Sequence, residues 1–194
     1  MDRTTEVRAA VGRFDDLATV VGPRRPDVGG CWCMAYRDSR VATMERPDFV
    51  RGLCETDPGP GVLAYVDGEP AGWCSVAPRS TYRRLVNSRT LPHVDDRDPW
   101  SAVCFVVRPG YRRQGLMHDL LAGAVAHAAA HGAEVVEGYP LDTDGERVDV
   151  ISGYVGTTRL FEAAGFERVV RTTGRSGGRP RWLVRRELGG AAQA

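Results

Sequence analysis

A basic turn between an apolar run and a helical pattern is the stretch of this sequence whose residue types could bind an anion. Residues 103–107 are apolar, residues 112–115 are Arg-Arg-Gln-Gly, and apolar side chains then recur at helical spacing over 116–128. The first turn of a helix carries unpaired N–H groups and a partial positive charge, which favour a phosphate or pyrophosphate. The turn has neither the P-loop pattern nor the glycine fingerprint of dinucleotide-binding folds. Taken alone, the stretch predicts either an anion site or an ordinary strand–turn–helix with a solvated basic corner.

The same stretch resembles the acyl-CoA-binding signature of the GNAT superfamily of N-acyltransferases. In that signature a strand ending Val-x-Pro-x-Tyr-Arg leads into Arg/Gln-x-x-Gly-x-Gly/Ala at a helix start, and the match here runs from Val107 through Arg112 and Gly115. Met117 replaces the usual second glycine or alanine, and a side chain there would crowd the pyrophosphate. The segment Leu160–Phe166 resembles a second family motif, Leu-Tyr-x-x-x-Gly-Phe.

This resemblance implies that acetyl-CoA is the co-substrate and that an amine of a small molecule or peptide attacks its thioester directly. The tetrahedral oxyanion of such a reaction needs a hydrogen-bond donor, and a strand-end N–H near Val106 or Val107 is the natural candidate. His118 follows the turn and could either reach a CoA phosphate or simply face water. The full set of residues expected to bind the cofactor is Phe105, Val106, Val107, Arg112, Arg113, Gln114, Gly115, Leu116, Met117 and His118.

Proton transfer in this reaction would need an acid and a base. Phe161 stands where the second family motif has a tyrosine that often protonates the leaving thiolate, and phenylalanine cannot donate a proton. We expect Tyr154 to act as that acid or to contact the pantetheine arm, although an aromatic side chain packed on the sheet would also explain it. Glu137 is the expected general base, because it lies on the strand next to the cofactor opening. The acidic stretch 95–98 could hold a cationic amine or form a solvated loop.

Two other functions remain open from the residues alone. Phe161 and Met117 depart from the family pattern, as they would in a non-catalytic acyl-CoA sensor. Cys31 and Cys33 form a close pair that a strand would place on one face, as a redox or metal module requires. No second pair follows at zinc spacing, so no metal is expected, and the five scattered cysteines would otherwise be small buried hydrophobes.

The composition is that of a globular protein in a reducing compartment. The chain of 194 residues is 42% hydrophobic and 26% charged, with a formal net charge of +1. This charge argues against nucleic acid or an anionic membrane as a partner, and no apolar stretch approaches the roughly 18 residues that span a bilayer. The N-terminal sequence lacks a secretory signal pattern, so a cytoplasmic location is expected. Every residue in the Lys+Arg count is arginine, which excludes lysine chemistry.

The order of predicted elements indicates an α/β fold with a mixed sheet, similar to the GNAT order. We expect a single domain over residues 1–188, with about seven strands flanked by helices, one parallel crossover around the central helix, and an added N-terminal helix. Residues 189–194 are expected to be a disordered tail, and the exposed terminal strands offer an edge for a homodimer. The polar segments 78–98 and 141–153 are expected to form the acceptor pocket. The expected helices cover 7–21, 46–54, 116–128 and 154–164, and the expected strands cover 31–36, 62–66, 71–76, 100–107, 134–139, 168–173 and 181–187.

Overall fold

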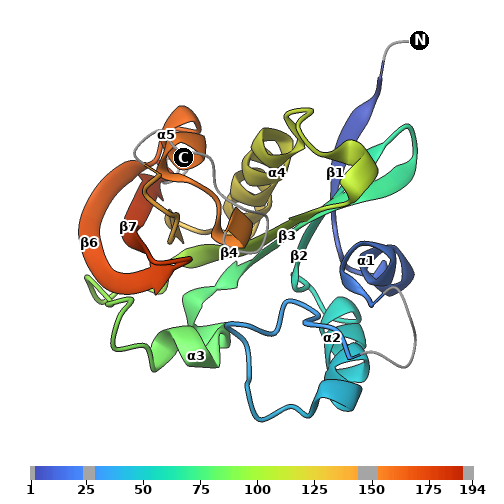
Figure 1. The fold of residues 1–194 in the computed structure, drawn as a ribbon, viewed down its shortest axis with the longest axis horizontal. Helices are drawn as coiled ribbons and strands as arrows, with labels where there is room; N and C mark the ends of the chain where they lie inside the picture. The colour runs from blue at the N-terminus through green and yellow to red at the C-terminus, as the bar shows by residue number, and fades with distance from the viewer. Residues whose placement is uncertain (1–2, 24–28, 144–152, 190–194) are drawn as a thin grey trace.

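The computed structural model describes residues 3–23, 29–143 and 153–189, and these build a seven-stranded sheet with helices on both faces (Figure 1). The strand order is β1-β2-β3-β4-β5-β7-β6, in which β4 and β5 run parallel and the other neighbours run antiparallel. This confirms the predicted mixed α/β sheet. The strands are β1 (Thr5–Ala9), β2 (Gly61–Val66), β3 (Glu69–Pro78), β4 (Trp100–Val107), β5 (Val135–Gly138), β6 (Glu167–Ser176) and β7 (Arg179–Glu187).

Five α-helices and four short 3₁₀ turns connect the strands in the described residues. The α-helices are α1 (Phe14–Val21), α2 (Arg46–Cys54), α3 (Arg83–Val86), α4 (Leu116–Ala130) and α5 (Thr158–Ala163). The 3₁₀ turns are η1 (Thr43–Glu45), η2 (Arg79–Thr81), η3 (Pro109–Tyr111) and η4 (Gly153–Val155). No described helix is long and apolar enough to cross a membrane.

The helix α4 covers one face of the sheet, as its apolar spacing predicts. Its side chains Leu116, Leu120, Leu121, Ala124, Val125 and Ala128 are all buried. They form a hydrophobic cluster with residues of β2, β3 and β4 and with Phe161 of α5, so α4 and α5 lie on the same side of the sheet (Figure 1). Because α4 connects the two parallel strands, its first turn lies where β4 ends.

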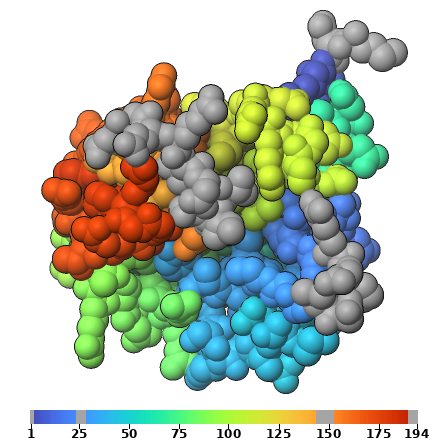
Figure 2. Space-filling view, viewed as in Figure 1, coloured from blue at the N-terminus to red at the C-terminus, as the bar shows by residue number. Residues whose placement is uncertain are grey.

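The helices α1, α2 and α3 and the segment 29–41 cover the opposite face. Their cluster is built on large buried aromatic side chains, including Trp73 of β3 and Tyr82. In the space-filling view, the blue and green surface of these N-terminal elements lies below the yellow surface of α4 (Figure 2). This face also contains most of the buried charged side chains, which are described below.

The hairpin of β2 and β3 forms where Asp67 and Gly68 predict it. Both residues have positive φ, +50° and +85°, which is the conformation that a two-residue hairpin turn requires. Such turns match the twist of the flanking strands.

Two predictions near the N-terminus were wrong. The start of the expected helix 7–21 belongs to the edge strand β1, which ends at Ala9 and whose residues alternate between half-buried and exposed, and α1 begins only at Phe14. The expected strand 31–36 is a series of turns, since Trp32 and Cys33 have φ of +50° and +54°, which a strand does not allow. The strand count still comes to seven because β1 takes the place of the missing strand. The expected tail and much of the loop 141–153 lie outside the described residues.

Candidate active site

The sheet opens between β4 and β5, and the opening begins at a defined residue. The two strands pair over three positions, and the last pair joins Ala102 to Gly138. On its other side β4 pairs antiparallel with β3. Ala102 pairs with Val76 and Cys104 pairs with Ser75, so Val103 has no partner on β3 and forms a bulge. Among the described residues, β4 is therefore paired with β3 alone beyond Val103. Ligands of α/β sheets bind at such openings beyond the carboxyl ends of the strands.

The backbone of β4 presents hydrogen-bonding groups to this opening. The N–H of Arg108 donates to a carbonyl of β3 at 2.9 Å, so by alternation the N–H of Val106 also faces β3, whereas those of Phe105 and Val107 face the opening. The carbonyl of Val107 confirms this orientation, because it accepts a hydrogen bond from Nε of Arg112 at 2.9 Å. The sequence led us to expect the N–H of Val106 or Val107 as the oxyanion donor. Of these two N–H groups, that of Val107 faces the opening.

The turn that follows β4 presents a row of free N–H groups at the start of α4. Arg113 has φ of +61° and Gly115 has φ of +82°, and these two left-handed residues shape the turn. Within the described residues, the backbone N–H groups of 113–117 have no hydrogen-bond partner. They lie at the positive end of a helix of 15 residues. This is the geometry that a diphosphate requires.

The side chains of the turn divide into those that hold it and those free to meet a ligand. Gln114 accepts a hydrogen bond from Arg3 at 2.6 Å and donates to the carbonyl of Gly110 at 3.1 Å, so it holds the turn in place. His118 is exposed. Met117 is half-buried and packs against the hydrophobic cluster under α4, which keeps its thioether in contact with the core.

Phe161 is fully buried beside the opening, and its side chain has no acidic proton to donate. Its ring packs edge-on against Phe105 and Phe166, with ring centroids 6.0 and 5.0 Å away. Gly138 and Gly156 leave room for it, since a β-carbon on Gly138 would lie 2.2 Å from the ring. The position that carries the family's tyrosine is thus a hydrophobic contact in this chain.

Tyr154 is the hydroxyl that the structure places next to the opening. It belongs to η4, which packs against β4, and its side chain packs against the hydrophobic cluster that contains Tyr36. Tyr36 in turn accepts a hydrogen bond from Nη1 of Arg181 at 2.6 Å. Burial, followed by the neighbouring Tyr36, raises the pKa of Tyr154 above its ordinary value. The hydroxyl therefore stays protonated at physiological pH, as a proton donor must.

Glu137 lies inside the sheet and is enclosed by cationic and hydroxyl groups. Its carboxylate accepts hydrogen bonds from Arg79 at 2.7 Å, from Arg185 at 3.1 Å and from Ser101 at 3.3 Å, and a further one from the hydroxyl of Tyr139. The residue has no exposed surface. A carboxylate held in this way lacks both the free lone pair and the access that a general base needs. The geometry argues for a structural role in place of the base expected from sequence.

The buried arginines of this sheet face were not among the residues expected from sequence. Arg185, which contacts Glu137, and Arg181 both lie on β7, and both are buried. A signal was present, because residues 181, 183 and 185 share one face of a strand and Leu183 marks that face as buried. Tyr36 gave no signal of its own, since it lies in the segment wrongly expected to be a strand.

Cys31 and Cys33, the candidate redox or metal pair, differ in their solvent exposure. Cys31 is exposed, whereas Cys33 is buried with its Sγ 3.3 Å from that of Cys104 and 3.1 Å from the indole nitrogen of Trp73. Hydrogen bonding from Cys33, together with burial, raises the pKa of the Cys104 thiol. No group of three or more potential ligands that could hold a metal occurs among the described residues.

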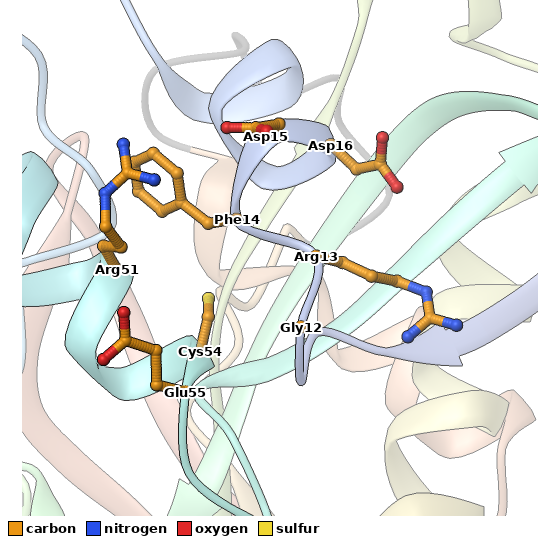
Figure 3. A pocket seen from close by; sticks show the side chains of 8 residues that line it. All are labelled: Gly12, Arg13, Phe14, Asp15, Asp16, Arg51, Cys54 and Glu55. Atoms are coloured by element: carbon orange, nitrogen blue, oxygen red, sulfur yellow. The ribbon is translucent and has the colours of Figure 1, made fainter.

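A separate pocket of about 370 Å³ lies between the β1–α1 turn and the end of α2 (Figure 3). The guanidinium of Arg51 lies over the ring of Phe14 at 3.8 Å, and Asp16 accepts a hydrogen bond from Tyr65 at 2.6 Å. The buried thiol of Cys54, whose pKa burial raises to about 11, is directed toward it. The lining combines acidic and basic side chains, which gives the pocket no preference for one charge.

Comparison with known proteins identifies the family. Residues 28–144, more than half of the chain, match the model of the acetyltransferase (GNAT) family, so the chain belongs to that family and the resemblance seen in the sequence is confirmed. A comparison with curated protein sequences finds no match.

Solved structures share the fold at low sequence identity. A mosquito arylalkylamine N-acetyltransferase-like 5b protein is 12% identical, with a TM-score of 0.59 over 95% of this chain and 100% of that one. A chain of the NatC complex, solved with Gag peptide and CoA, is 13% identical with a TM-score of 0.55 over 97% and 99% of the chains. A GNAT acetyltransferase from Streptococcus pneumoniae is 16% identical, also with a TM-score of 0.55, over 96% and 100%. These likenesses establish the GNAT fold.

Proposed function

We propose that this protein transfers an acetyl group from acetyl-CoA to the amine of a small molecule or peptide. One observation carries the proposal: the open edge of β4 leads directly into the turn at 113–117, whose N–H groups have no partner among the described residues. The amides of a pantetheine arm can pair with a strand edge, and a diphosphate can bind at a helix start. In one CoA molecule the pantetheine arm is joined to the diphosphate, just as the edge of β4 is followed by the turn at 113–117.

The proposed reaction is direct attack of the amine on the thioester. The nitrogen–carbon bond forms and the carbon–sulfur bond breaks, while the nitrogen loses a proton and the sulfur gains one. The N–H groups of Phe105 and Val107 are the donors available to the oxyanion. Tyr154 would protonate the leaving thiolate. Because Glu137 is enclosed, we propose that the amine enters neutral and that water carries its proton away.

We also propose a cytoplasmic location and a homodimer for this protein. The five cysteines are free thiols, which fits a reducing cytoplasm. The sheet ends at β1 and β6, and Val169 on β6 is 46% exposed, so this edge could pair two copies into a homodimer.

Binding of acetyl-CoA tests the proposal through a matched pair of glycine variants. Gly115 and Gly110 both have open space where a β-carbon would lie, but only Gly115 of the two has positive φ. Gly115→Ala should strain the turn by about 1 kcal/mol and weaken acetyl-CoA binding about fivefold in calorimetry. Gly110→Ala should bind as the parent does. A parent protein that binds no acetyl-CoA would contradict the proposal.

A non-catalytic acyl-CoA sensor is the second candidate, and the buried Phe161 favours it. It predicts the same binding but no release of CoA. Release of free thiol across a broad panel of amines would support transfer, whereas tight binding with no thiol release from any amine would favour the sensor.

A further inference from the structure

The sheet face under α1, α2 and α3 contains more buried positive charge than negative charge. Four arginine side chains on this face are at most 7% exposed, and in the described part of the chain one carboxylate is buried with them, that of Glu137. Burying a charge without a counter-charge costs several kcal/mol, so an imbalance of this size needs an explanation. The four residues are Arg37, Arg79, Arg181 and Arg185.

Two of the four arginines are neutralised within the protein. Arg79 and Arg185 both contact Glu137, with nitrogen–oxygen distances of 2.7 and 3.1 Å. Arg185 also pairs at 2.6 Å with Asp95, whose pKa this contact holds below its ordinary value. These contacts account for two cations and two anions.

The other two arginines have no carboxylate partner in the described residues. Arg37 donates at 2.7 Å to the carbonyl of Pro60, and its guanidinium lies over the ring of Tyr82, 4.7 Å from the centroid. Arg181 donates from Nε to the carbonyl of Tyr139 at 2.7 Å and from Nη1 to Tyr36 at 2.6 Å. Its third nitrogen, Nη2, is buried and has no hydrogen-bond partner. A guanidinium presents its donors in a fixed fork, so Arg181 retains the N–H groups of Nη2 for a ligand.

Arg181 lies close to the proposed chemistry. It sits on β7 opposite Leu141, which continues the chain beyond the end of β5, and therefore on the side where β4 and β5 separate. Its partner Tyr36 belongs to the hydrophobic cluster against which Tyr154, the proposed acid, packs. Tyr36 thus contacts the unpaired cation and is a neighbour of the group that would protonate the thiolate.

We propose that Arg181 binds a carboxylate of the substrate, so that this acyltransferase acts on a substrate carrying both the reacting group and a carboxylate. The inference rests on the proposed function. A carboxylate would accept from Nη2 of Arg181 and neutralise the buried charge, and Tyr36 would hold the guanidinium in orientation. The carboxylate belongs either to the acceptor, as in an amino acid, or to the acyl chain, as in succinyl-CoA.

Direct binding tests this site without any transfer reaction. Calorimetry would compare L-phenylalanine, L-methionine and succinate with their amides, using the parent protein, Arg181→Gln and the control Arg171→Gln. Arg171 lies on the neighbouring strand β6 and is exposed, so Arg171→Gln removes the same charge from a surface position. We expect at least one carboxylate to bind the parent and Arg171→Gln about tenfold or more tightly than its amide, and Arg181→Gln to lose that preference.

Kinetics then identifies the source of the carboxylate. With acetyl-CoA, a preference in kcat/KM for amino acids over their amides places the carboxylate on the acceptor. A preference for succinyl-CoA over acetyl-CoA with the same amines places it on the acyl chain. In either case Arg181→Lys, which keeps the charge but loses the fork, should retain part of the preference.

The inference is overturned if acids and amides bind the parent equally, or if Arg181→Gln keeps the preference for the acid. If Arg181→Gln does not fold, Tyr36→Phe replaces it, since this variant removes the partner that orients the guanidinium and should weaken the preference. Acetyl-CoA binding by each variant is measured in parallel. Loss of acetyl-CoA binding in the parent would refute the proposed function, whereas normal acetyl-CoA binding without a carboxylate preference would refute this inference alone.

Discussion

Tyr154 and Phe161 lie beside the same opening but pack into different hydrophobic clusters, one on each face of the sheet. Of the two side chains, only that of Tyr154 has a hydroxyl proton that it can donate. The buried Phe161 fixes the wall of the opening through its contacts with other aromatic rings. Tyr154 packs beside Tyr36, whose hydroxyl accepts a hydrogen bond from the buried cation of Arg181. At the scale of single residues, the proposed mechanism therefore gives packing to Phe161 and proton donation to Tyr154.

Removal of the Tyr154 hydroxyl should affect turnover more than binding. We expect Tyr154→Phe to lower kcat about 100-fold, which is the lower range for loss of a general acid, and to leave acetyl-CoA affinity within about twofold. Because the pKa of Tyr154 is raised, the parent should keep its activity well into alkaline solution. Tyr111→Phe, in the turn after β4, is the matched control. An unchanged rate and pH profile in Tyr154→Phe would leave the tyrosine with a packing role.

Gly138 gives a second test at the residue scale, this time of stability. A β-carbon here would overlap the ring of Phe161 at 2.2 Å, so Gly138→Ala should destabilise the fold by about 1–3 kcal/mol in urea unfolding. Gly52→Ala in α2 meets no atom within 4 Å and should be neutral or stabilising. Equal stability of the two variants would mean that the ring can move aside.

At the scale of elements, one buried network ties four strands together. Arg79 directly follows β3, Ser101 lies on β4, Glu137 on β5 and Arg185 on β7, and all four meet at the Glu137 carboxylate. The network lies one position before the last pair of the parallel ladder, since Ser101 pairs with Glu137 and the last pair joins Ala102 to Gly138. It therefore sets the width at which β4 and β5 begin to separate.

Glu137→Gln distinguishes a structural carboxylate from a catalytic one. Breaking a buried ion pair by removing one partner costs about 3–5 kcal/mol, so we expect this variant to unfold at much lower urea concentration. Where it remains folded, its kcat should stay within a few-fold of the parent value. A stable variant with a kcat lowered 100-fold or more would instead restore Glu137 as the general base.

Most elements could be predicted because their residue patterns are local. The run 103–107, the turn at Gly115 and the stripe of α4 carry their own periodicity, as does the Asp67-Gly68 hairpin. The segment 31–36 could not be predicted, because its composition is apolar and its turns depend on contacts made after folding. The network around Glu137 is likewise invisible in sequence, since its members come from strands separated by up to 106 positions and meet only through strand order.

At the scale of the whole molecule, acid stability should depend on the contact between the loop before β4 and β7. Arg185 and Arg97 lower the pKa of Asp95, so its carboxylate stabilises the fold at neutral pH. This stabilisation is lost as the pH falls from the ordinary value for aspartate through the lower pKa of the folded state. Asp95→Asn should therefore unfold more easily at pH 7 and show a flatter decline in unfolding free energy below pH 4. Asp15→Asn, on the exposed surface of α1, should retain the parent slope.

The bulge at Val103 gives the molecule an interior sheet edge. An ordinary edge strand presents unpaired N–H and C=O groups to any passing chain and so invites aggregation. Here the unpaired edge of β4 lies in the middle of the sheet order, between β3 on one side and the β5–β7 side on the other. A narrow, flexible chain with amide groups can enter such a recess, whereas a second protein strand with its own neighbours is too wide. The sheet thereby presents an edge whose width suits the proposed pantetheine arm better than a second protein strand.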